Sequence, residues 1–148
     1  MYCDTLTSPL AIPDRDENGI DDLITIPDNV TIAGLRVEVQ IDHTWVGDLV
    51  VTLAHVETLT LTTLMFRPGQ LEFGCSGRNV ACVFDDAAAT YADNQCADPP
   101  PAIAGIVRPT DPLSVFNGES SAGEWRLFVS DHGGGDTGTL VHWCVEVQ

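Results

Sequence analysis

The sequence predicts an all-β fold, a sandwich of two sheets, from three observations. Apolar and polar residues alternate with a period of two in several segments, which is typical of half-buried antiparallel strands. Short clusters rich in Gly, Pro, Asp and Asn separate these segments. No helical pattern alternates with the strands, which argues against βαβ architectures and favours sandwiches, including jelly rolls.

The alternation is clearest where Leu35, Val37, Val39 and Ile41 are each followed by a polar residue. Four more segments, at residues 49–53, 59–65, 125–129 and 141–147, have the same period and are expected to be strands. Turn clusters lie at residues 27–29, 67–69, 98–101, 117–118 and 133–136. Residues 87–92 could form one helical turn at most, because the segment is so short.

Residues 69–112 are the least regular part of the sequence and carry three of the five Cys. We interpret this block as a long excursion stapled by a disulfide, because long loops are usually functional or cross-linked. No linker or internal repeat divides the chain. Residues 1–148 are therefore expected to form a single domain.

The charge excludes two classes of partner. The chain has 148 residues, with 22 acidic and 6 basic side chains, no Lys and a net charge of -16. Nucleic-acid binding requires clustered basic residues, and anionic membrane surfaces repel such a chain. No stretch approaches the roughly 20 apolar residues of a membrane span. We expect neither nucleic acid nor membrane as a partner.

Five Cys in a chain without Lys and rich in Thr, Val, Asp and Gly indicate an oxidising compartment. No pair has the C-x-x-C spacing of a zinc or redox site, which leaves disulfides as their role. We therefore expect a secreted, extracellular protein with disulfides. Spacing alone leaves several pairings open, and one thiol must stay unpaired.

Catalytic residues are hard to find. Ser76 and Ser120 both miss the G-x-S-x-G pattern of hydrolases, and the four His are scattered singly among predicted strands and loops. The absence of Lys excludes amine catalysis. We predict that the isolated chain is not an enzyme and has no catalytic residues.

One group of acids follows a calcium-loop pattern. Residues 14–22 fit D-x-D-x-N-G-x-x-D, in which side-chain oxygens surround a hard cation. Thr25 stands where an EF-hand has its bidentate Glu, and a solvated acidic turn is the alternative. This gives a second, weaker set of Ca²⁺ ligands: Asp14, Asp16, Asn18 and Asp22.

A further group of acids lies at predicted strand ends. Adjacent carboxylates repel one another unless a cation bridges them, so these positions favour Ca²⁺. The alternative is that the carboxylates cap backbone amides at the strand ends. We predict a first Ca²⁺ site from Asp48, Asp85, Asp86 and Asp131.

Residues 42–53, DHTWVGDLVVTL, resemble the P domain, also called the P/Homo B domain, of kexin- and furin-like proprotein convertases. Further similar segments follow in the family's order over nearly the whole chain. They are AIPD at 11–14, FDDAA at 84–88, PTDPLSVFNG at 109–118, GEWRL at 123–127 and DTGTLVHW at 136–143. The chain departs from the family at Ala88, where bacterial relatives often have Glu.

The resemblance implies a jelly-roll β-sandwich of galactose-binding-like topology, carried C-terminal to a secreted subtilisin-like serine endopeptidase. It implies a noncatalytic accessory module that stabilises the catalytic domain in the same parent chain and packs on it through an apolar face. The alternative is a carbohydrate- or protein-binding module that uses exposed aromatics such as Trp45 or Tyr91. We expect the isolated domain to be a monomer.

The pairing of the Cys can then be predicted. Cys144 is out of register with the apolar residues of its strand and faces a side where the N-terminal segment could lie, which favours a Cys3–Cys144 disulfide. A Cys75–Cys96 disulfide would close the irregular excursion and matches the bacterial relatives. Cys82 would then be a buried thiol.

Overall fold

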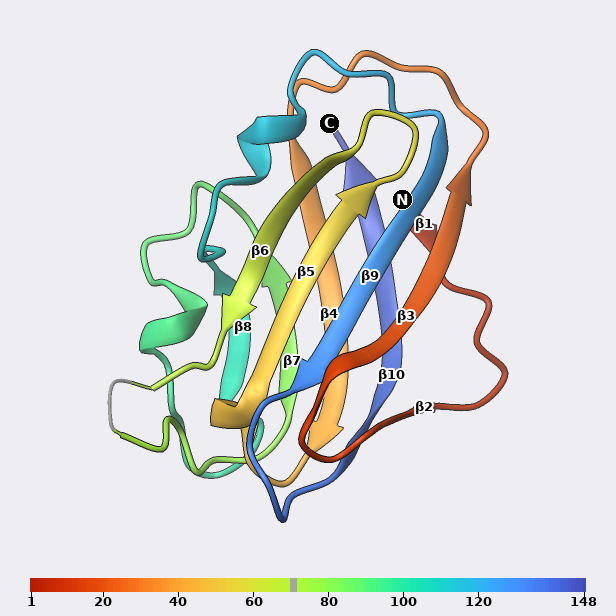
Figure 1. Cartoon of the computed structure of the whole chain (residues 1–148). Coiled ribbons are helices and arrows are strands. Elements are labelled where there is room, and N and C mark those ends of the chain that lie inside the picture. The colour runs from red at the N-terminus through yellow and green to blue at the C-terminus, as the bar shows by residue number, and fades with distance from the viewer. Residues whose placement is uncertain (70–71) are drawn as a thin grey trace.

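The computed structural model describes residues 1–69 and 72–148 and shows two β-sheets packed face to face (Figure 1). This confirms the predicted all-β sandwich. The six-stranded sheet contains β1 (Tyr2–Cys3), β2 (Leu10–Ile12), β10 (Gly138–Val147), β4 (Leu35–His43), β7 (Val80–Phe84) and β8 (Ile103–Val107). The four-stranded sheet contains β3 (Asp16–Ile26), β9 (Gly123–Asp131), β5 (Leu49–His55) and β6 (Thr60–Phe66). Short 3₁₀ helices η1 (Val46–Asp48), η2 (Ala92–Asn94) and η3 (Leu113–Phe116) lie between strands.

Eight strands pair in a nested order. β2 pairs with β10, β3 with β9, β4 with β7 and β5 with β6, all antiparallel. This is the pairing of one long hairpin folded over two sheets, which is the jelly roll. β8 is an addition that lies parallel to β7, and β1 pairs with β10 beyond β2.

The core lies between the sheets and follows the predicted alternation. Val37, Val39 and Ile41 on β4 have no exposed surface, while the residues between them face solvent at least in part. Trp125 and Trp143 are also fully buried. Their indole N–H groups donate to Ser121 O (2.9 Å) and Asp22 Oδ2 (2.8 Å), so their burial leaves no indole donor unpaired.

The acidic segment 14–22 differs from the expected loop, because β3 already begins at Asp16. The register with β9 shifts between Asp16 and Ile20, which accommodates Gly19 at a φ of 59°. A Cβ on Gly19 would lie 2.1 Å from the Val129 carbonyl oxygen. The glycine therefore permits a bulged strand that lies close against β9.

Residues 69–112 are more regular than expected, since β7 and β8 lie within them. Gln70 and Leu71, which belong to this block, lie outside the described residues. The possible helical turn at residues 87–92 is not α-helical; η2 begins at Ala92 instead. Among the described residues, no helix has the length and apolar character needed to cross a membrane.

Both predicted disulfides are present: Cys3 is joined to Cys144 and Cys75 to Cys96. Cys3 and Cys144 are directly paired residues of β1 and β10, so the bridge ties the N-terminal strand to the sheet. Cys82 is a buried free thiol, 3% exposed. Burial, with a smaller contribution from the Glu38 charge, raises the pKa of Cys82 to about 12, which makes it a weak nucleophile.

Candidate functional site

Each end of the sandwich contains a buried histidine beside carboxylates. At the lower end in Figure 1, β4 ends at His43, β9 ends at Asp131 and η1 leads into β5. At the upper end, β5 ends at His55, close to the segment that leads into β9. Both histidines continue the inward-facing register of their strands, and both are almost fully buried.

At the lower end, His43 of one sheet bonds Asp131 of the other, with 2.9 Å between Nε2 and Oδ2. Neither side chain has exposed surface. The Trp45 backbone N–H donates to His43 Nδ1 (3.1 Å), so the neutral ring carries its proton on Nε2 and donates it to Asp131. The Gly133 N–H donates to Asp131 Oδ1 (3.0 Å). Both oxygens of Asp131 therefore have protein donors.

Asp48 ends η1 beside this pair and is only 6% exposed. Burial raises the pKa of Asp48, and the Asp131 and Asp136 charges raise it further. His43 and Arg67 act in the opposite direction but do not cancel the shift. The fold thus places a carboxylate in a position that disfavours its charged form.

The other two members of the predicted first site lie elsewhere. Asp85 follows β7 and bonds Arg36 Nε (2.7 Å) and the Ala87 N–H (2.8 Å). Its pKa is lowered first by the Ala87 N–H and also by Arg36, although burial opposes this. Arg36 and His43 are seven positions apart on β4, which separates them by roughly 24 Å. Asp85 therefore does not meet Asp48 or Asp131.

Asp86 caps η3. Its two oxygens accept the N–H groups of Leu113 (2.8 Å) and Ser114 (2.8 Å). This is the capping role that we considered as the alternative to a cation. The structure thus divides the predicted first site, with Asp48 and Asp131 at one place and Asp85 and Asp86 at another.

The predicted second site is divided in the same way. Asp14 accepts the Gly135 N–H (3.0 Å) and Asp16 accepts the Asn18 N–H (2.9 Å). Asp22 lies further along β3 on its inward side and bonds Trp143. Asp16 and Asn18 therefore lie together, while Asp14 and Asp22 bond other parts of the chain.

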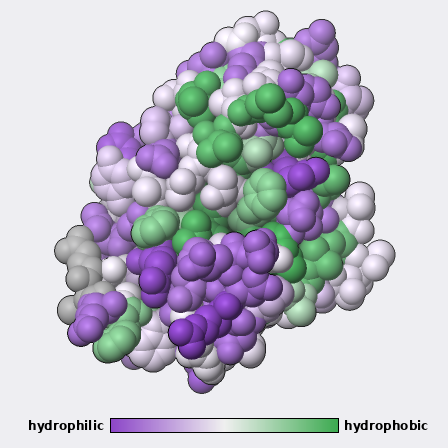
Figure 2. Space-filling view, viewed as in Figure 1, coloured by the Kyte–Doolittle hydropathy of each residue, from purple (hydrophilic) through white to green (hydrophobic). Residues whose placement is uncertain are grey.

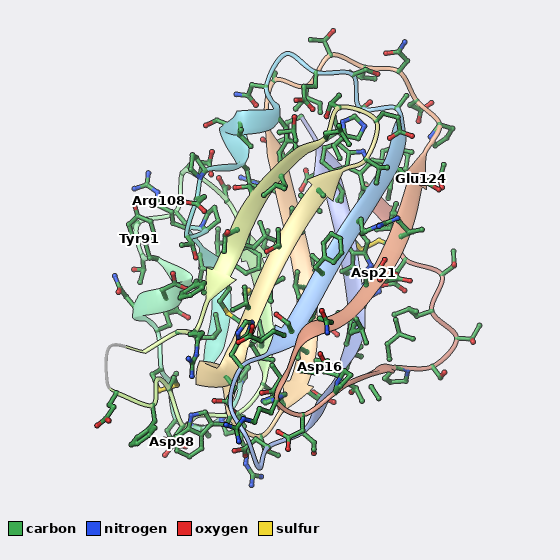
Figure 3. The ribbon with its side chains drawn as sticks, viewed as in Figure 1. Asp16, Asp21, Tyr91, Asp98, Arg108 and Glu124 are labelled. Carbon is green, nitrogen blue, oxygen red and sulfur yellow. A yellow bond between two sulfur atoms is a disulfide. The ribbon has the colours of Figure 1, made fainter. Side chains whose placement is uncertain are left out.

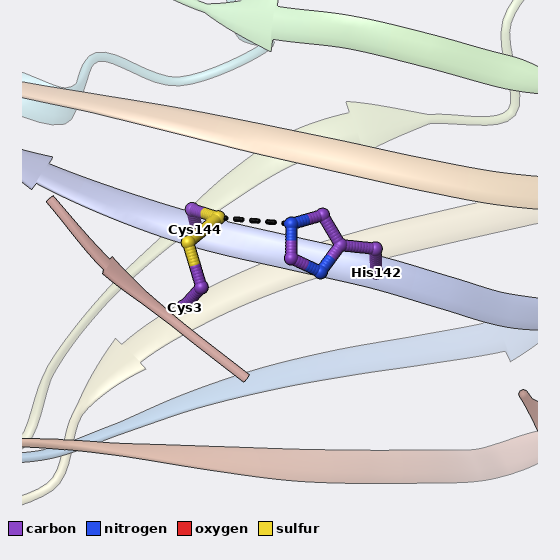
Figure 4. Close-up of side chains that lie close together, drawn as sticks. All are labelled: Cys3, His142 and Cys144. Atoms are coloured by element: carbon purple, nitrogen blue, oxygen red, sulfur yellow. Dashed lines mark hydrogen bonds between the residues drawn. A yellow bond between two sulfur atoms is a disulfide. The ribbon is translucent and has the colours of Figure 1, made fainter. Parts of the chain in front are cut away.

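Three His, Cys, Asp or Glu side chains converge at one place in the described part of the chain: Cys3, His142 and Cys144 (Figure 4). The two sulfurs are joined in a disulfide, which removes the thiolates that a metal would need. His142 lies 3.1 Å from Cys144 Sγ and 2.8 Å from Asp4 Oδ2. This cluster therefore does not offer a metal site, and calcium binding stays a prediction.

The upper end contains a network that the sequence analysis missed. His55 stacks on Trp125 with ring centroids 4.4 Å apart, and its Nε2–H donates to the Ala122 carbonyl (3.1 Å). Glu119 accepts hydrogen bonds from Thr58 and Thr60. His55 Nδ1 lies 3.2 Å from Glu119 Oε2, a bond that the ring donates only when both of its nitrogens carry a proton. Although burial opposes it, these donors lower the pKa of Glu119. The Glu119 carboxylate therefore has hydrogen-bond partners within the protein.

Neither predicted nucleophile candidate contacts a histidine among the described residues. Ser120 instead donates to Asn29 (2.7 Å), and Ser76 is exposed. A different pair lies at the end of β9, where Ser130 Oγ is 2.9 Å from Nε2 of His132, the residue after the strand. Glu17 Oε1 is 3.6 Å from His132 Nδ1. The Ser130 backbone lies within the β9–β5 ladder, so it is not free to form an oxyanion hole. Glu17 is 81% exposed and positions the imidazole weakly.

Tyr91 lines an open groove of about 400 Å³ together with Arg108, Thr110 and Ser114. Figure 3 shows the Tyr91 and Arg108 side chains next to each other, and the Arg108 guanidinium lies 5.4 Å from the centroid of the Tyr91 ring. Arg108 Nε also donates to the Asp86 carbonyl (2.9 Å). The chain's own arginine thus occupies a face of the ring that a sugar would need.

These features define a jelly-roll module. At its upper end the Glu119 carboxylate has hydrogen-bond donors, and at its lower end burial and neighbouring charges disfavour the charged form of Asp48. The described residues contain no assembled nucleophilic site. Residues 102–147 match the family model of the proprotein convertase P-domain. The resemblance predicted from the sequence is therefore confirmed over the C-terminal third. No curated protein sequence matches the chain.

Two solved structures share the fold. The serine protease of Aeromonas sobria in complex with the chaperone matches with a TM-score of 0.64 and 20% identity. The structure of the serine protease of Aeromonas sobria alone matches with a TM-score of 0.61 and 18% identity. Each match covers 99% of this chain and 26% of the protease chain, so the chain spans about a quarter of their length.

Proposed function

We propose that the chain is a noncatalytic accessory module of a secreted subtilisin-like serine endopeptidase, and that it stabilises the catalytic domain in the same parent chain. The P-domain match over residues 102–147 carries this proposal. The fold similarity to serine proteases over a quarter of their length supports it, because the remaining three quarters leave room for a catalytic domain. The two disulfides agree with an extracellular location.

The outer side of the four-stranded sheet is the docking surface in this proposal. We call it the apolar face and define it by Leu23, Val50, Leu61, Phe66 and Phe128. Leu61 and Phe66 on β6 are 63% and 55% exposed. Figure 2 shows hydrophobic residues over the middle and upper parts of this side and hydrophilic residues at the lower end.

The strand register brings these residues together. Val50 is paired with Phe66 across β5 and β6. Thr52 is paired with Phe128 across β5 and β9, so β5 presents no charge beside that ring. β9 adds one charge to this side, because Arg126 is paired with Leu23 and its guanidinium lies 5.7 Å from the centroid of the Phe128 ring. The outward residues of β4 on the opposite sheet, by contrast, are Arg36, Glu38, Gln40 and Asp42. Exposed apolar patches of this kind mark protein interaction sites.

The occupant in this proposal is the peptidase catalytic domain. Covering Leu61 and Phe66 would remove large apolar side chains from water, which contributes roughly 1.5–3 kcal/mol for each one fully buried. Contacts of this size are sufficient to slow local opening of the docked domain. The module would thus act on the lifetime of the peptidase and leave its chemistry unchanged.

The test compares the full parent protein with two variants of it. Leu61→Asp combined with Phe66→Asp places charge on the apolar face, whereas Ile106→Asp changes an equally exposed residue, 60% exposed on β8 of the other sheet. We expect the double variant to shorten the half-life of peptidase activity at elevated temperature at least fivefold, and the control to leave it unchanged. Equal half-lives for all three proteins would contradict the docking surface.

A carbohydrate-binding module is the alternative function. Tyr91 is 40% exposed and lies in a groove, which agrees with it, but Arg108 already covers the ring. The accessory role therefore has the better support.

A further inference from the structure

A second feature of the surface lies apart from the apolar face, at the lower end of the sandwich. A pocket of about 330 Å³ opens between the segment around η1 and the loop that joins β9 to β10. Its walls include the side chains of Trp45 and Phe73, and Asp48 and Asp136 also line it. The hydrophilic lower end of Figure 2 includes these loops. We call this the Asp48 pocket.

Asp48 is the observation that points to a ligand. The residue is only 6% exposed, and its carboxylate accepts no hydrogen bond from the described residues. Its oxygens are not among the buried atoms without a partner, so they reach the open space of the pocket. Its oxygens lie against Gly133, where a Cβ would be 2.1 Å from Oδ1. Any other residue at position 133 would displace the carboxylate. Buried carboxylates are normally satisfied, as Asp131 is by His43 and Gly133.

The charges around the pocket favour a cationic ligand. Asp131 and Asp136 raise the pKa of Asp48 in addition to burial, and Thr44 bonds one oxygen of Asp136 (2.7 Å). Arg67 is the cationic side chain among the described residues that line the pocket, and its Nε donates to the Gly47 carbonyl (3.3 Å). The Arg15 side chain lies against Gly134, another lining residue. Three carboxylates, Asp48, Asp131 and Asp136, outnumber the guanidinium groups of Arg67 and Arg15 in this region.

The kind of cation follows from the walls. Ca²⁺ takes six to eight oxygen ligands at about 2.3–2.6 Å. The described residues bring no three carboxylates of this region within ligand distance of one another. Aromatic walls with a carboxylate between them suit an organic cation instead, because a ring face attracts an ammonium or guanidinium group. The Trp45 indole N–H donates to the Phe73 carbonyl (2.9 Å), which links the two aromatic residues.

We propose that the Asp48 pocket binds the side chain of a Lys or Arg residue in a partner peptide, with Asp48 as the counter-ion and Trp45 and Phe73 as the walls. The net charge of -16 favours a basic partner through long-range attraction. The chain has no Lys of its own to fill the pocket. This binding role does not depend on the apolar face.

The test is a titration of the chain with the tripeptide Ac-Gly-Arg-Gly-NH₂, and with the same peptide carrying neutral citrulline in place of Arg. Binding is followed by the NMR signal of the Trp45 indole N–H, assigned with Trp45→Phe. We expect the Arg peptide to bind at least tenfold more tightly than the citrulline peptide. Asp48→Asn should weaken Arg-peptide binding at least tenfold, and Phe73→Ala, a change at a 68% exposed side chain, severalfold.

The matched control is Asp98→Asn, which removes the same charge from an exposed residue outside the Asp48 pocket (Figure 3). It should leave the affinity unchanged. Equal weakening by Asp48→Asn and Asp98→Asn would reduce the binding to general charge attraction and overturn the proposal. Equal binding of the citrulline peptide would overturn it too, as would tight Ca²⁺ binding at Asp48 that displaces the Arg peptide.

Discussion

Each end of the sandwich contains a partly or fully buried carboxylate, and the two differ in the hydrogen-bond donors around them. At the upper end, Glu119 accepts hydrogen bonds from Thr58 and Thr60, and its pKa is lowered. At the lower end, Asp48 is more deeply buried but has no such donors among the described residues, and its pKa is raised. A carboxylate of the first kind holds the fold together. One of the second kind costs stability, because its charged form is disfavoured.

The largest effect on stability should come from the buried pair of the lower end. Asp131→Ala leaves His43 without its partner and the Gly133 N–H without an acceptor, so we expect it to lower the free energy of unfolding by about 3 kcal/mol. Asp131→Asn keeps an oxygen acceptor and should lose less. Urea unfolding followed by fluorescence measures both. A loss below that of Asp131→Asn would show that the pair is not structural.

Removal of the satisfied carboxylate at the upper end should have the next largest effect. Glu119→Ala removes the acceptor of the Thr58 and Thr60 hydroxyls, and we expect a loss of about 2 kcal/mol. Glu124→Ala, at a side chain on β9 in the same half of the molecule, is the control and should change stability little (Figure 3).

The effect of Glu119 should depend on pH. Because its pKa is lower in the folded chain than in the unfolded chain, its stabilisation is complete above the ordinary carboxyl pKa. It is lost as the pH falls through the lowered value. The difference in unfolding free energy between the wild type and Glu119→Gln should therefore be constant near neutral pH and shrink in acid. A difference that grows in acid would contradict the assignment.

The alternation of apolar residues predicts much of this arrangement. The inward register of Val37, Val39 and Ile41 also places His43 inside, and the same argument applied to β5 places His55 inside. The sequence analysis treated both histidines as scattered, although this signal was present. Their partners could not be found in the same way. Asp131 lies 88 positions from His43 and Glu119 lies 64 positions from His55, so both pairs exist only because the fold brings distant parts of the chain together.

The acidic residues show what the sequence alone cannot predict. Local patterns correctly identify residues at strand ends and turns, such as Asp85 and Asp86, but not the direction of each side chain. Asp86 caps η3, a helix 27 positions further along the chain, and Asp22 bonds an indole of the facing sheet. Backbone and side-chain donors that are distant in sequence thus compete with a cation for the same oxygens. Only the folded chain shows which donors succeed.

The difference between the Asp48 and Glu119 carboxylates is tested most directly by the free energies of unfolding of Asp48→Asn and Glu119→Gln at neutral pH. Asparagine at position 48 removes a charge that burial disfavours, together with its repulsion from Asp131 and Asp136. The account therefore predicts a gain of about 1 kcal/mol, or about 4 °C in Tm. Because the pKa of Asp48 is raised, the gain should fade as the pH drops and the wild-type carboxylate becomes protonated. Glu119→Gln should change stability in the opposite direction. A loss of stability in Asp48→Asn equal to that in Glu119→Gln would mean that both carboxylates are structural, and would contradict the account.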